Sequence, residues 1–414
     1  MSSFQPVRGT RDLLPEAHRG HRHVVETARR VAETYGFHEV ATPIFEFTDI
    51  FARSMGETSD VVSKEMYSFT DKAGESITLR PEYTAGICRA VISNGLTQAL
   101  PFKAFAAGPM FRYERPQKGR QRQFHQIDLE LIGAGEPEAD AEVIALAFDI
   151  LAALGVAEKC RLEINTLGDA ESRAAYRTIL LDYLQAFRGD LSEDSRRRLE
   201  TNPLRILDSK DPVDREIVGG APLLADHLTP AAADFFQAVQ ERLARLRIPF
   251  EINAHLVRGL DYYTHTAFEF VTEALGAQGA VVAGGRYDGL IAELGGPQTP
   301  AIGWAGGIER LALLMGDPPP APRPIALVPV GAAAETTALG LARRLRQAGL
   351  IVDWSYRGNP GKRMKRAAKL NAAYAVLIGD DELARGSATV RDLDSGAQEE
   401  VPLDRLAARL GAHG

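Results

Sequence analysis

Five prolines within seven residues, at positions 318–324, constrain this chain more than any other feature. Each proline fixes φ and removes a backbone donor, so neither a helix nor a sheet continues through such a segment. We therefore expect a stiff, extended linker between a large N-terminal region and a small C-terminal one. At about 150 residues per domain, the 414 residues suggest two or three domains, and the linker gives one boundary.

The region after the linker, 325–414, has the pattern of a small α/β domain. Alternating strands and helices at its short spacing predict a mostly parallel sheet. Residues 357–369 hold six Lys or Arg and no acid, which suits either a solvated helix face or contact with a phosphate backbone. Apolar periodicity predicts three strands and one helix: Ile325–Val330, Leu350–Trp354, Tyr374–Ile378 and Ala333–Gln347.

The region before the linker mixes helices and strands. Residues 168–250 are helical in period, so we expect an inserted helical module that separates 1–167 from 251–317. Two of the strands, joined by a polar loop, predict a long hairpin. The predicted helices are His18–Tyr35, Asp140–Leu154 and Ile308–Met315. The predicted strands are His38–Phe47 (bent at Pro43), Leu100–Arg112, Gln123–Ile132, Ala267–Thr272 and Gln278–Ala283.

The composition is that of a folded protein of a reducing compartment. An apolar content of 45% and a net charge of −7 exclude wholesale disorder and a general polycation, but not a local basic patch. Cys88 and Cys160 cannot build a disulfide framework or a thiolate zinc site. We find no signal-peptide core and no run near the roughly 18 apolar residues of a membrane span. We expect a soluble, cytoplasmic protein without membrane contact or structural metal.

The densest polar segment is the predicted hairpin loop with its flanks, 111–126. Guanidinium groups on a rigid strand suit phosphate oxygens and stay charged at any working pH. Phe124 is placed to stack on a base, although an exposed hairpin can also carry such residues without a ligand. The sequence has no Walker phosphate loop, so a nucleotide would be held by arginines of this kind. Five basic residues stand against the single acid Glu114: Arg112, Arg115, Lys118, Arg120 and Arg122.

Four further segments place Arg, Asp, Glu or Tyr beside glycines or at a helix start. Paired tyrosines are often only core residues, so each segment alone leaves a structural and a binding role open. Arg310 is expected in the first turns of a helix, where free N–H groups favour an anion. The segments are 79–84 (LRPEYT), 258–264 (RGLDYYT), 284–289 (GGRYDG) and 303–310 (GWAGGIER).

In this order, and together with Arg-Gly-Thr-Arg-Asp at 8–12, these segments resemble the bacterial histidyl-tRNA synthetases. Segments 258–264 and 284–289 look like the two histidine-specific motifs of that family, and the resemblance covers essentially the whole chain. It implies an α+β catalytic domain on an antiparallel sheet (the class II synthetase fold) with a helical insertion. It also implies a C-terminal α/β anticodon-binding domain, and a homodimer with His18–Phe47 at its interface.

The reaction that the resemblance implies has two steps. L-Histidine and ATP, carried as its Mg²⁺ complex, give histidyl-adenylate and pyrophosphate, and the histidyl group then passes to the terminal adenosine of tRNA(His). The amino-acid carboxylate is itself the nucleophile, so the first step needs alignment and charge neutralisation rather than a strong base. Arg112 and Arg258 are implied to be catalytic, on either side of the α-phosphate.

The other roles that the resemblance implies fall into three groups: contacts to ATP, to histidine and to tRNA. Glu130 and Tyr263 are expected to recognise the imidazole ring, and no residue is assigned to Mg²⁺. ATP is expected to contact Arg112, Glu114, Arg120, Arg122, Phe124 and Arg310. Histidine is expected to contact Glu82, Thr84, Gln126, Glu130, Arg258, Tyr263 and Tyr287. The tRNA is expected to contact Arg115, Gln117, Lys118, Lys362 and Arg363.

One departure and one alternative accompany this interpretation. Position 83 is Tyr where many relatives have Gly, which is expected to crowd the wall of the histidine pocket. The alternative is the synthetase-like regulatory subunit of ATP phosphoribosyltransferase, which resembles the catalytic core but does not aminoacylate. That subunit typically lacks the anticodon domain and has degenerate histidine motifs, whereas 325–414 and 258–263 are intact here. A sensor with an idle site is disfavoured, because unused buried charges cost stability.

Overall fold

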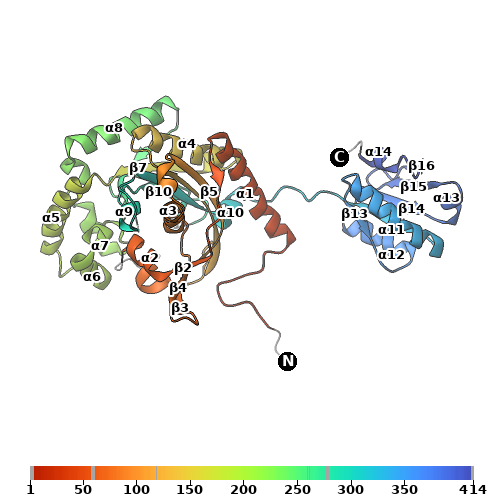
Figure 1. The fold of residues 1–414 in the computed structure, drawn as a ribbon, viewed down its shortest axis with the longest axis horizontal. Helices are drawn as coiled ribbons and strands as arrows, with labels where there is room; N and C mark the ends of the chain where they lie inside the picture. The colour runs from red at the N-terminus through yellow and green to blue at the C-terminus, as the bar shows by residue number, and fades with distance from the viewer. Residues whose placement is uncertain are drawn as a thin grey trace. The chain divides into compact units, whose positions relative to one another are not determined.

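The computed structural model describes residues 4–56, 61–117, 119–258, 260, 262–276 and 279–411. The chain forms two compact units, Met1–Pro319 and Pro320–Gly414, that meet within the proline-rich segment (Figure 1). Each unit has its own sheet and its own apolar core. Since the proline-rich segment only connects them, each unit is a separate folded body.

The larger unit is built on an eight-stranded sheet with the order β1-β5-β6-β11-β10-β9-β7-β8 among the described residues. The six strands from β5 to β7 in this order pair antiparallel, and β1 and β8 add in parallel at the two edges. The predicted long hairpin is present as β5 and β6. The strands are β1 (His38–Glu39), β5 (Phe102–Phe111), β6 (Gln123–Ile132), β7 (Arg161–Thr166), β8 (Glu251–Ile252), β9 (Thr264–Val271), β10 (Ala280–Arg286) and β11 (Ala301–Gly307).

Two strand predictions need correction. The segment 38–47 is not one bent strand but two short ones in different sheets, β1 and β2 (Phe45–Phe47). Pro43 lies between them, and a proline cannot donate to a ladder. The strand predicted from Gln278 begins at Ala280 and runs on to Arg286, while Gln278 itself is outside the described residues.

Side chains alternate between the two faces of the large sheet, and each face has its own core. On one face Ile127, Leu129 and Leu131 of β6 pack against the apolar stripes of four helices. On the other face Met110 and Ile132 pack against three shorter helices. Polar residues of β6 on this second face are therefore enclosed between sheet and helices. The first set is α1 (Pro15–Thr34), α4 (Pro137–Ala153), α8 (Pro230–Arg245) and α10 (Ile308–Met315); the second is α2 (Thr48–Met55), α3 (Thr84–Ser93) and α9 (Leu290–Glu293).

The helical segment 168–250 is divided between two cores. Its first helices are α5 (Ala170–Ala186), α6 (Glu193–Thr201) and α7 (Pro212–Gly219), which share a core of their own at one end of the unit (Figure 1). Helix α8 differs, because its Phe236, Val239 and Leu243 belong to the core of the large sheet. The segment is helical as predicted, but its last helix is structurally part of the sheet's cover.

A small three-stranded sheet in the larger unit has one apolar face in solvent. It contains β2, β4 (Ser76–Leu79) and β3 (Tyr67–Thr70), with β4 in the middle. Phe47, Ile77 and Phe69 are direct cross-strand neighbours and so share a face, as do Phe45, Leu79 and Tyr67 two residues along. Phe45, Phe47 and Phe69 are 54%, 57% and 49% exposed. Such a face on a protein marks a surface of interaction.

The smaller unit contains a five-stranded sheet with the order β13-β12-β14-β15-β16. The predicted strands β12, β13 and β14 are parallel, but β15 and β16 add antiparallel, so the sheet is mixed rather than mostly parallel. On β13 the half-buried Trp354 has its ring 5.9 Å from that of Tyr356. The strands are β12 (Ile325–Pro329), β13 (Val352–Trp354), β14 (Tyr374–Ile378), β15 (Ser387–Asp392) and β16 (Gln398–Pro402); the helices are α11 (Ala332–Gln347), α12 (Pro360–Lys369), α13 (Asp380–Ala384) and α14 (Leu406–Gly411).

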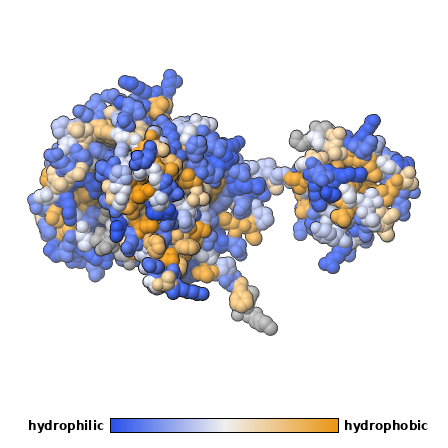
Figure 2. Space-filling view, viewed as in Figure 1, coloured by the Kyte–Doolittle hydropathy of each residue, from blue (hydrophilic) through white to orange (hydrophobic). Residues whose placement is uncertain are grey.

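Both units are covered mainly by hydrophilic residues, with a hydrophobic area near the middle of the larger unit on the face shown in Figure 2. Within the described part of the chain, each helix is too short or too polar to cross a bilayer.

Candidate active site

A pocket of about 490 Å³ lies on the second face of the large sheet. Strands β6, β9, β10 and β11 contribute to its wall, together with the start of α10 and the segment 257–263. Asp208 and Lys210 of the helical segment also line it, and no sequence pattern pointed to them. The predicted ATP- and histidine-binding residues in this wall are Glu82, Thr84, Arg112, Glu114, Arg120, Phe124, Gln126, Arg258, Tyr263, Tyr287 and Arg310.

Several arginines gather in one part of the pocket. Arg112 donates from Nε to the Pro81 carbonyl at 2.9 Å, and its guanidinium carbon is 5.3 Å from the centre of the Phe124 ring. Arg120 pairs with Glu114 at 3.1 Å. Burial lowers the pKa of Arg310, and the neighbouring Arg120 lowers it further. The two cations repel each other, so an anion between them would be stabilised.

Arg258 lies in the same pocket and is paired with Glu269 of β9. Burial by itself would lower the pKa of Arg258, but Tyr263 and the Glu269 carboxylate outweigh it and raise the pKa. The guanidinium carbon is 5.3 Å from the centre of the Tyr263 ring. Sequence analysis missed Glu269, although a lone acid between two buried phenylalanines of a strand was a usable signal.

The deeper part of the pocket is built from carboxyl groups. Glu82, 4% exposed, accepts at 2.9 Å from the Ala85 backbone N–H at the start of α3, where a helix favours negative charge. Glu130 is fully buried behind the pocket wall and accepts from Thr84 Oγ1 at 2.6 Å and from the Tyr287 hydroxyl. Burial raises the pKa of Glu130 to about 8. Gly303 makes room for it, because a Cβ there would be 1.6 Å from Glu130 Oε2.

Asp128 is a pocket residue that the motifs did not predict. It is fully buried on β6 between Gln126 and Glu130, and it lines the pocket. Burial raises the pKa of Asp128 well above its usual range, and the carboxylates of Glu130 and Glu82 raise it further. The alternation of the strand was the available signal, because it places residues 124, 126, 128 and 130 on one face.

Aromatic rings close the wall around these carboxyl groups. The ring of Tyr262 is 4.6 Å from that of Tyr263 and 5.7 Å from that of Tyr287. Trp304 of β11 is 2% exposed, and its ring lies on the opposite face of the sheet, where the indole nitrogen donates to the Val143 carbonyl of α4 at 3.1 Å. The buried carboxyl groups are thus surrounded by tyrosine rings on the pocket side, and electrostatic interactions are stronger there than in water.

Two residues lie elsewhere than expected. Arg122 is not among the residues that line the pocket; it lies before β6 begins, and its guanidinium carbon is 3.8 Å from the centre of the Tyr113 ring. Tyr83 does not crowd the pocket either. It is buried away from that wall, where its hydroxyl accepts from Arg80 at 2.8 Å and lies close to Gly108.

The predicted tRNA-binding residues are divided in the same way. Arg115 and Gln117 are exposed in the β5–β6 loop, whereas Lys118 is outside the described residues. Lys362 is exposed on α12, but Arg363 is not part of an exposed basic face. It is 4% exposed and bonds the Pro329 carbonyl and Glu335, at 2.7 Å from the latter, so it holds α12 against β12 and α11.

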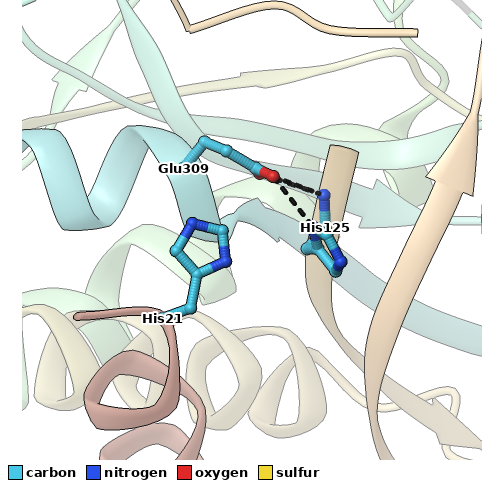
Figure 3. A group of neighbouring side chains, drawn as sticks. All are labelled: His21, His125 and Glu309. Atoms are coloured by element: carbon cyan, nitrogen blue, oxygen red, sulfur yellow. Dashed lines mark hydrogen bonds and ion pairs between the residues drawn. The ribbon is translucent and has the colours of Figure 1, made fainter. Parts of the chain in front are cut away.

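Behind the pocket, His21 of α1, His125 of β6 and Glu309 of α10 form a cluster (Figure 3). Glu309 accepts from the His125 backbone N–H at 3.0 Å and lies 2.9 Å from His125 Nδ1, and the two histidine rings are 5.4 Å apart. These hydrogen bonds lower the pKa of Glu309 although burial alone would raise it, and burial lowers the pKa of His21. The three residues are far apart in sequence and gave no local signal.

This cluster also has the donor types of a divalent cation, with ligand atoms within 4.8 Å of one another. Its carboxylate is already engaged by His125, which favours a structural role. Phe124 and Gln126 flank His125, and Arg310 follows Glu309, so the cluster fixes the backbone on which three pocket residues are mounted.

Comparison with known proteins agrees with this geometry. The family model for histidyl-tRNA synthetase matches residues 9–311, and that for the anticodon-binding domain matches residues 325–413. A histidine–tRNA ligase of Gluconacetobacter diazotrophicus is 62% identical over 410 residues, covering 99% of both chains. One of Rhodospirillum rubrum is 61% identical over 404 residues, covering 97% of each.

Solved structures give the same result. The apo histidyl-tRNA synthetase of S. aureus has a TM-score of 0.83 and 34% identity, covering 98% of this chain and 99% of that one. An ATP phosphoribosyltransferase regulatory subunit/histidyl-tRNA synthetase from Bacillus halodurans, at 22% identity and a TM-score of 0.62, shares the fold alone. With both family models matched in order and full-length relatives at this identity, the chain belongs to the histidyl-tRNA synthetase family.

Proposed function

We infer that this chain is a histidine–tRNA ligase, which activates L-histidine with ATP and transfers the histidyl group to the terminal adenosine of tRNA(His). The observation that carries this inference is the pairing of opposite charges in one pocket. Arginines in one part suit a polyphosphate, and buried carboxyl groups in the other suit an ammonium group and a nitrogen heterocycle. Family membership over the whole length supports the same conclusion.

In the activation step the histidine carboxylate attacks the α-phosphorus of ATP, and pyrophosphate leaves. Arg112 and Arg258 neutralise charge on the α-phosphate, and neither needs to move a proton, because a guanidinium stays ionised. Arg112 is held by the Pro81 carbonyl and Arg258 by Glu269, so both are oriented before the substrates arrive. Such preorganised cations stabilise charge more strongly in a partly buried pocket than in bulk water.

The remaining ATP contacts follow from the same geometry. Arg120 and Arg310 bind the outer phosphates, which relieves their mutual repulsion. Phe124 stacks on the adenine, with Glu114 beside it. ATP enters as its Mg²⁺ complex, and the pocket carboxylates Glu114, Glu269 and Asp208 are of the oxygen type that this ion prefers. Arg122 is left out of this set because its guanidinium lies on Tyr113.

Histidine is recognised in the carboxyl-lined part. Glu82, Thr84 and Gln126 face the ammonium group, and Tyr263 and Tyr287 face the imidazole ring, with Glu130 fixing the hydroxyls of Thr84 and Tyr287. A pocket that pairs with both ring nitrogens leaves buried groups unpaired when another amino acid enters. That loss gives roughly 10⁴–10⁵ discrimination without an editing step.

The smaller unit serves as the anticodon-binding domain of the enzyme. Exposed Lys362 and Lys365 of α12 contact the tRNA backbone, whereas the buried Arg363 only supports the helix. In the larger unit, Arg115 and Gln117 of the exposed β5–β6 loop contact the acceptor end, and Lys118, which lies outside the described residues, stays in the same predicted set. Phosphate contacts of this kind set affinity and register rather than sequence specificity.

The active form is a cytoplasmic homodimer. The apolar face of the β2–β4–β3 sheet supports this, because its exposed Phe45, Phe47 and Phe69 form a surface that a second copy can cover. Replacing Phe47 and Phe69 with Ser should shift sedimentation toward a monomer. The regulatory-subunit alternative is not favoured, since relatives named histidine–tRNA ligase match 99% of the chain.

The deciding experiment is ATP–pyrophosphate exchange with each of the twenty amino acids, without tRNA. We expect exchange with histidine alone, and charging of tRNA(His) when it is added. A folded protein that binds histidine but exchanges with no amino acid would overturn the ligase assignment. Exchange with several amino acids would instead show that the carboxyl-lined part does not select histidine.

A further inference from the structure

We propose that Asp128 binds the α-ammonium group of histidine together with Gln126, as a recognition residue in addition to those that the motifs indicate. The proposal rests on the assignment of the pocket to histidine. The observation behind it is that the pocket wall contains buried hydrogen-bond acceptors without donors from the described part of the chain. Both carboxyl oxygens of Asp128 and the Oε1 atom of Gln126 are buried and meet no hydrogen-bond donor among the described residues.

Such unpaired acceptors are costly, since a buried polar group without a partner loses its hydration and gains nothing in return. Asp128 is 0% exposed and lines the pocket, so a ligand can reach it although bulk solvent does not. The other carboxyl groups differ. Glu82 accepts from the Ala85 N–H, and Glu130 accepts from Thr84 and Tyr287.

The unpaired acceptor atoms of Gln126 and Asp128 indicate which group of a ligand would bind there. The pocket offers three acceptor atoms on Gln126 and Asp128, and an ammonium group offers three N–H donors and a positive charge. An imidazole N–H would pair only one of these atoms. The α-ammonium group is the part of histidine that can donate to Gln126 and Asp128 at once and still offer a donor to the neighbouring Glu82 and Thr84.

The order of residues along β6 gives the same assignment. Phe124, Gln126, Asp128 and Glu130 lie on one face, and side chains two apart on a strand are separated by roughly 6.6 Å. Phe124 is beside Arg112, where the nucleotide and the histidine carboxylate must meet. Glu130 is at the other end, behind Tyr287, where the ring is bound. The ammonium group, one bond from the carbon that bears the carboxylate, falls between them.

The charged groups around Asp128 couple its binding of a cation to its own protonation. The ionisable groups around it include Glu82, Glu130, Arg80, Arg112 and Tyr83, and its strand neighbours Ala106 and Ala305 bring no charge. Burial and the two carboxylates raise the pKa of Asp128, which favours its protonated form in the free site. An ammonium group beside it favours the ionised form, so histidine binding should be coupled to proton release.

The test compares wild type with Asp128→Asn, which keeps the shape of the side chain but not its charge. Calorimetry with L-histidine and with 3-(imidazol-4-yl)propionate, which lacks the ammonium group, separates recognition of that group from the rest. We expect the variant to bind L-histidine about 30-fold more weakly or worse, with binding of the analogue and of ATP unchanged. Titration in buffers of different ionisation enthalpy should show about one proton fewer released.

The outcomes separate this inference from the assignment of the site. If Asp128→Asn weakens the binding of L-histidine and of the analogue equally, or changes the binding of neither, Asp128 has no role in ammonium binding and the proposal fails. If wild type itself binds no histidine, the histidine assignment fails instead. An unchanged melting temperature and ATP affinity exclude misfolding, and Asp128→Glu, which keeps the charge, should recover more affinity than Asp128→Ala.

Discussion

The two parts of the pocket hold charge in opposite ways. In the arginine part, Arg112, Arg120, Arg258 and Arg310 stay ionised at any working pH. In the carboxyl part, burial raises the pKa of Glu82, Asp128 and Glu130, and that of Glu130 reaches about 8. One part therefore has a permanent charge, and the other has a charge that depends on its ligand.

The difference shows how one pocket serves two tasks. Phosphates are anionic at every relevant pH, so fixed cations suffice to align them. Histidine must be distinguished from other amino acids. Buried carboxyl groups provide this selectivity, because their ionised form is stabilised only when a ligand supplies the matching hydrogen-bond donors. The following predictions break or sharpen this contrast, from the largest effect to the smallest.

The largest effect, a loss of folding stability, is expected on removing a buried carboxylate that pairs with an arginine of the protein rather than with a ligand. Arg286 and Asp140 are both 0% exposed, and Arg286 Nε donates to Asp140 at 3.0 Å. Removing Asp140 leaves the buried Arg286 with the more exposed Asp288 as its counter-ion, at 3.1 Å, so Asp140→Ala should lower the free energy of unfolding by about 3 kcal/mol. Urea denaturation followed by circular dichroism measures this. Glu138→Ala, on the same helix but with its ion pair in solvent, should change nothing measurable.

The second prediction concerns the arginine part. Arg258→Ala should reduce the kcat of ATP–pyrophosphate exchange about 10²–10³-fold, by analogy with the loss of one oxyanion donor. Arg161→Ala is the matched control, because this arginine also pairs with a glutamate on the same sheet but is half exposed and outside the pocket. A variant with normal kcat and a raised KM for histidine would move Arg258 from catalysis to substrate binding.

The third prediction is a difference in pH dependence. Glu130 has its pKa raised to about 8, so it is protonated in the free enzyme at lower pH, and only its ionised form accepts fully from the Thr84 and Tyr287 hydroxyls that contact histidine. The KM for histidine should therefore fall as the pH rises from 6 to 8, by at most about tenfold per pH unit for one proton, while the KM for ATP stays constant. Parallel changes in both constants would show that the two parts are not independent.

The raised pKa of Glu130 also predicts how the stability of the enzyme depends on pH. A carboxyl group with a raised pKa in the folded state binds more protons folded than unfolded between its two pKa values. The free enzyme should thus lose stability as the pH rises from about 4.5 toward 8, and saturating histidine should restore part of it. Melting curves at several pH values, with and without histidine, check this. A stability that rises over this interval would contradict the burial of a neutral Glu130.

The smallest effect is expected in the smaller unit. Lys362→Ala should leave adenylate formation unchanged and reduce the salt dependence of tRNA binding by about 0.7–0.9 in the logarithmic slope. Arg363→Ala, its neighbour, is buried and should instead lower the melting temperature of this unit. Equal effects of both substitutions on tRNA binding would contradict the division between exposed and buried basic residues.

The sequence predicted most of the pocket because its residues lie in short motifs that resemble those of a known family. Gln126 and Glu130 were assigned through that resemblance, whereas Asp128 between them follows only from strand alternation. Arg122 was assigned by the same resemblance, but it precedes β6 and its guanidinium lies on the Tyr113 ring. Arg363 was taken as exposed, although Ala367 one helical turn later is also buried and marks the face that packs on the sheet.

Other features were outside the reach of such patterns. The His21–His125–Glu309 cluster joins three elements that only tertiary packing brings together. Strand β16 (QEEVP) is polar and mostly exposed, and β15 (SATVRD) is largely buried but mixes polar with apolar residues, so neither has the apolar run of β12 or β14. Helix α8 reads like its neighbours in the helical segment, and only the fold shows that it covers the large sheet.

The positions of the two tryptophans have an optical consequence. The chain has two, Trp304 on β11 beneath the pocket and Trp354 on β13 of the smaller unit. Each unit thus contains its own fluorophore, and a Trp354→Phe variant would emit from the larger unit alone. Quenching of that emission by histidine, and of the Trp304→Phe variant by tRNA, would report the two binding events of one enzyme in two separate signals.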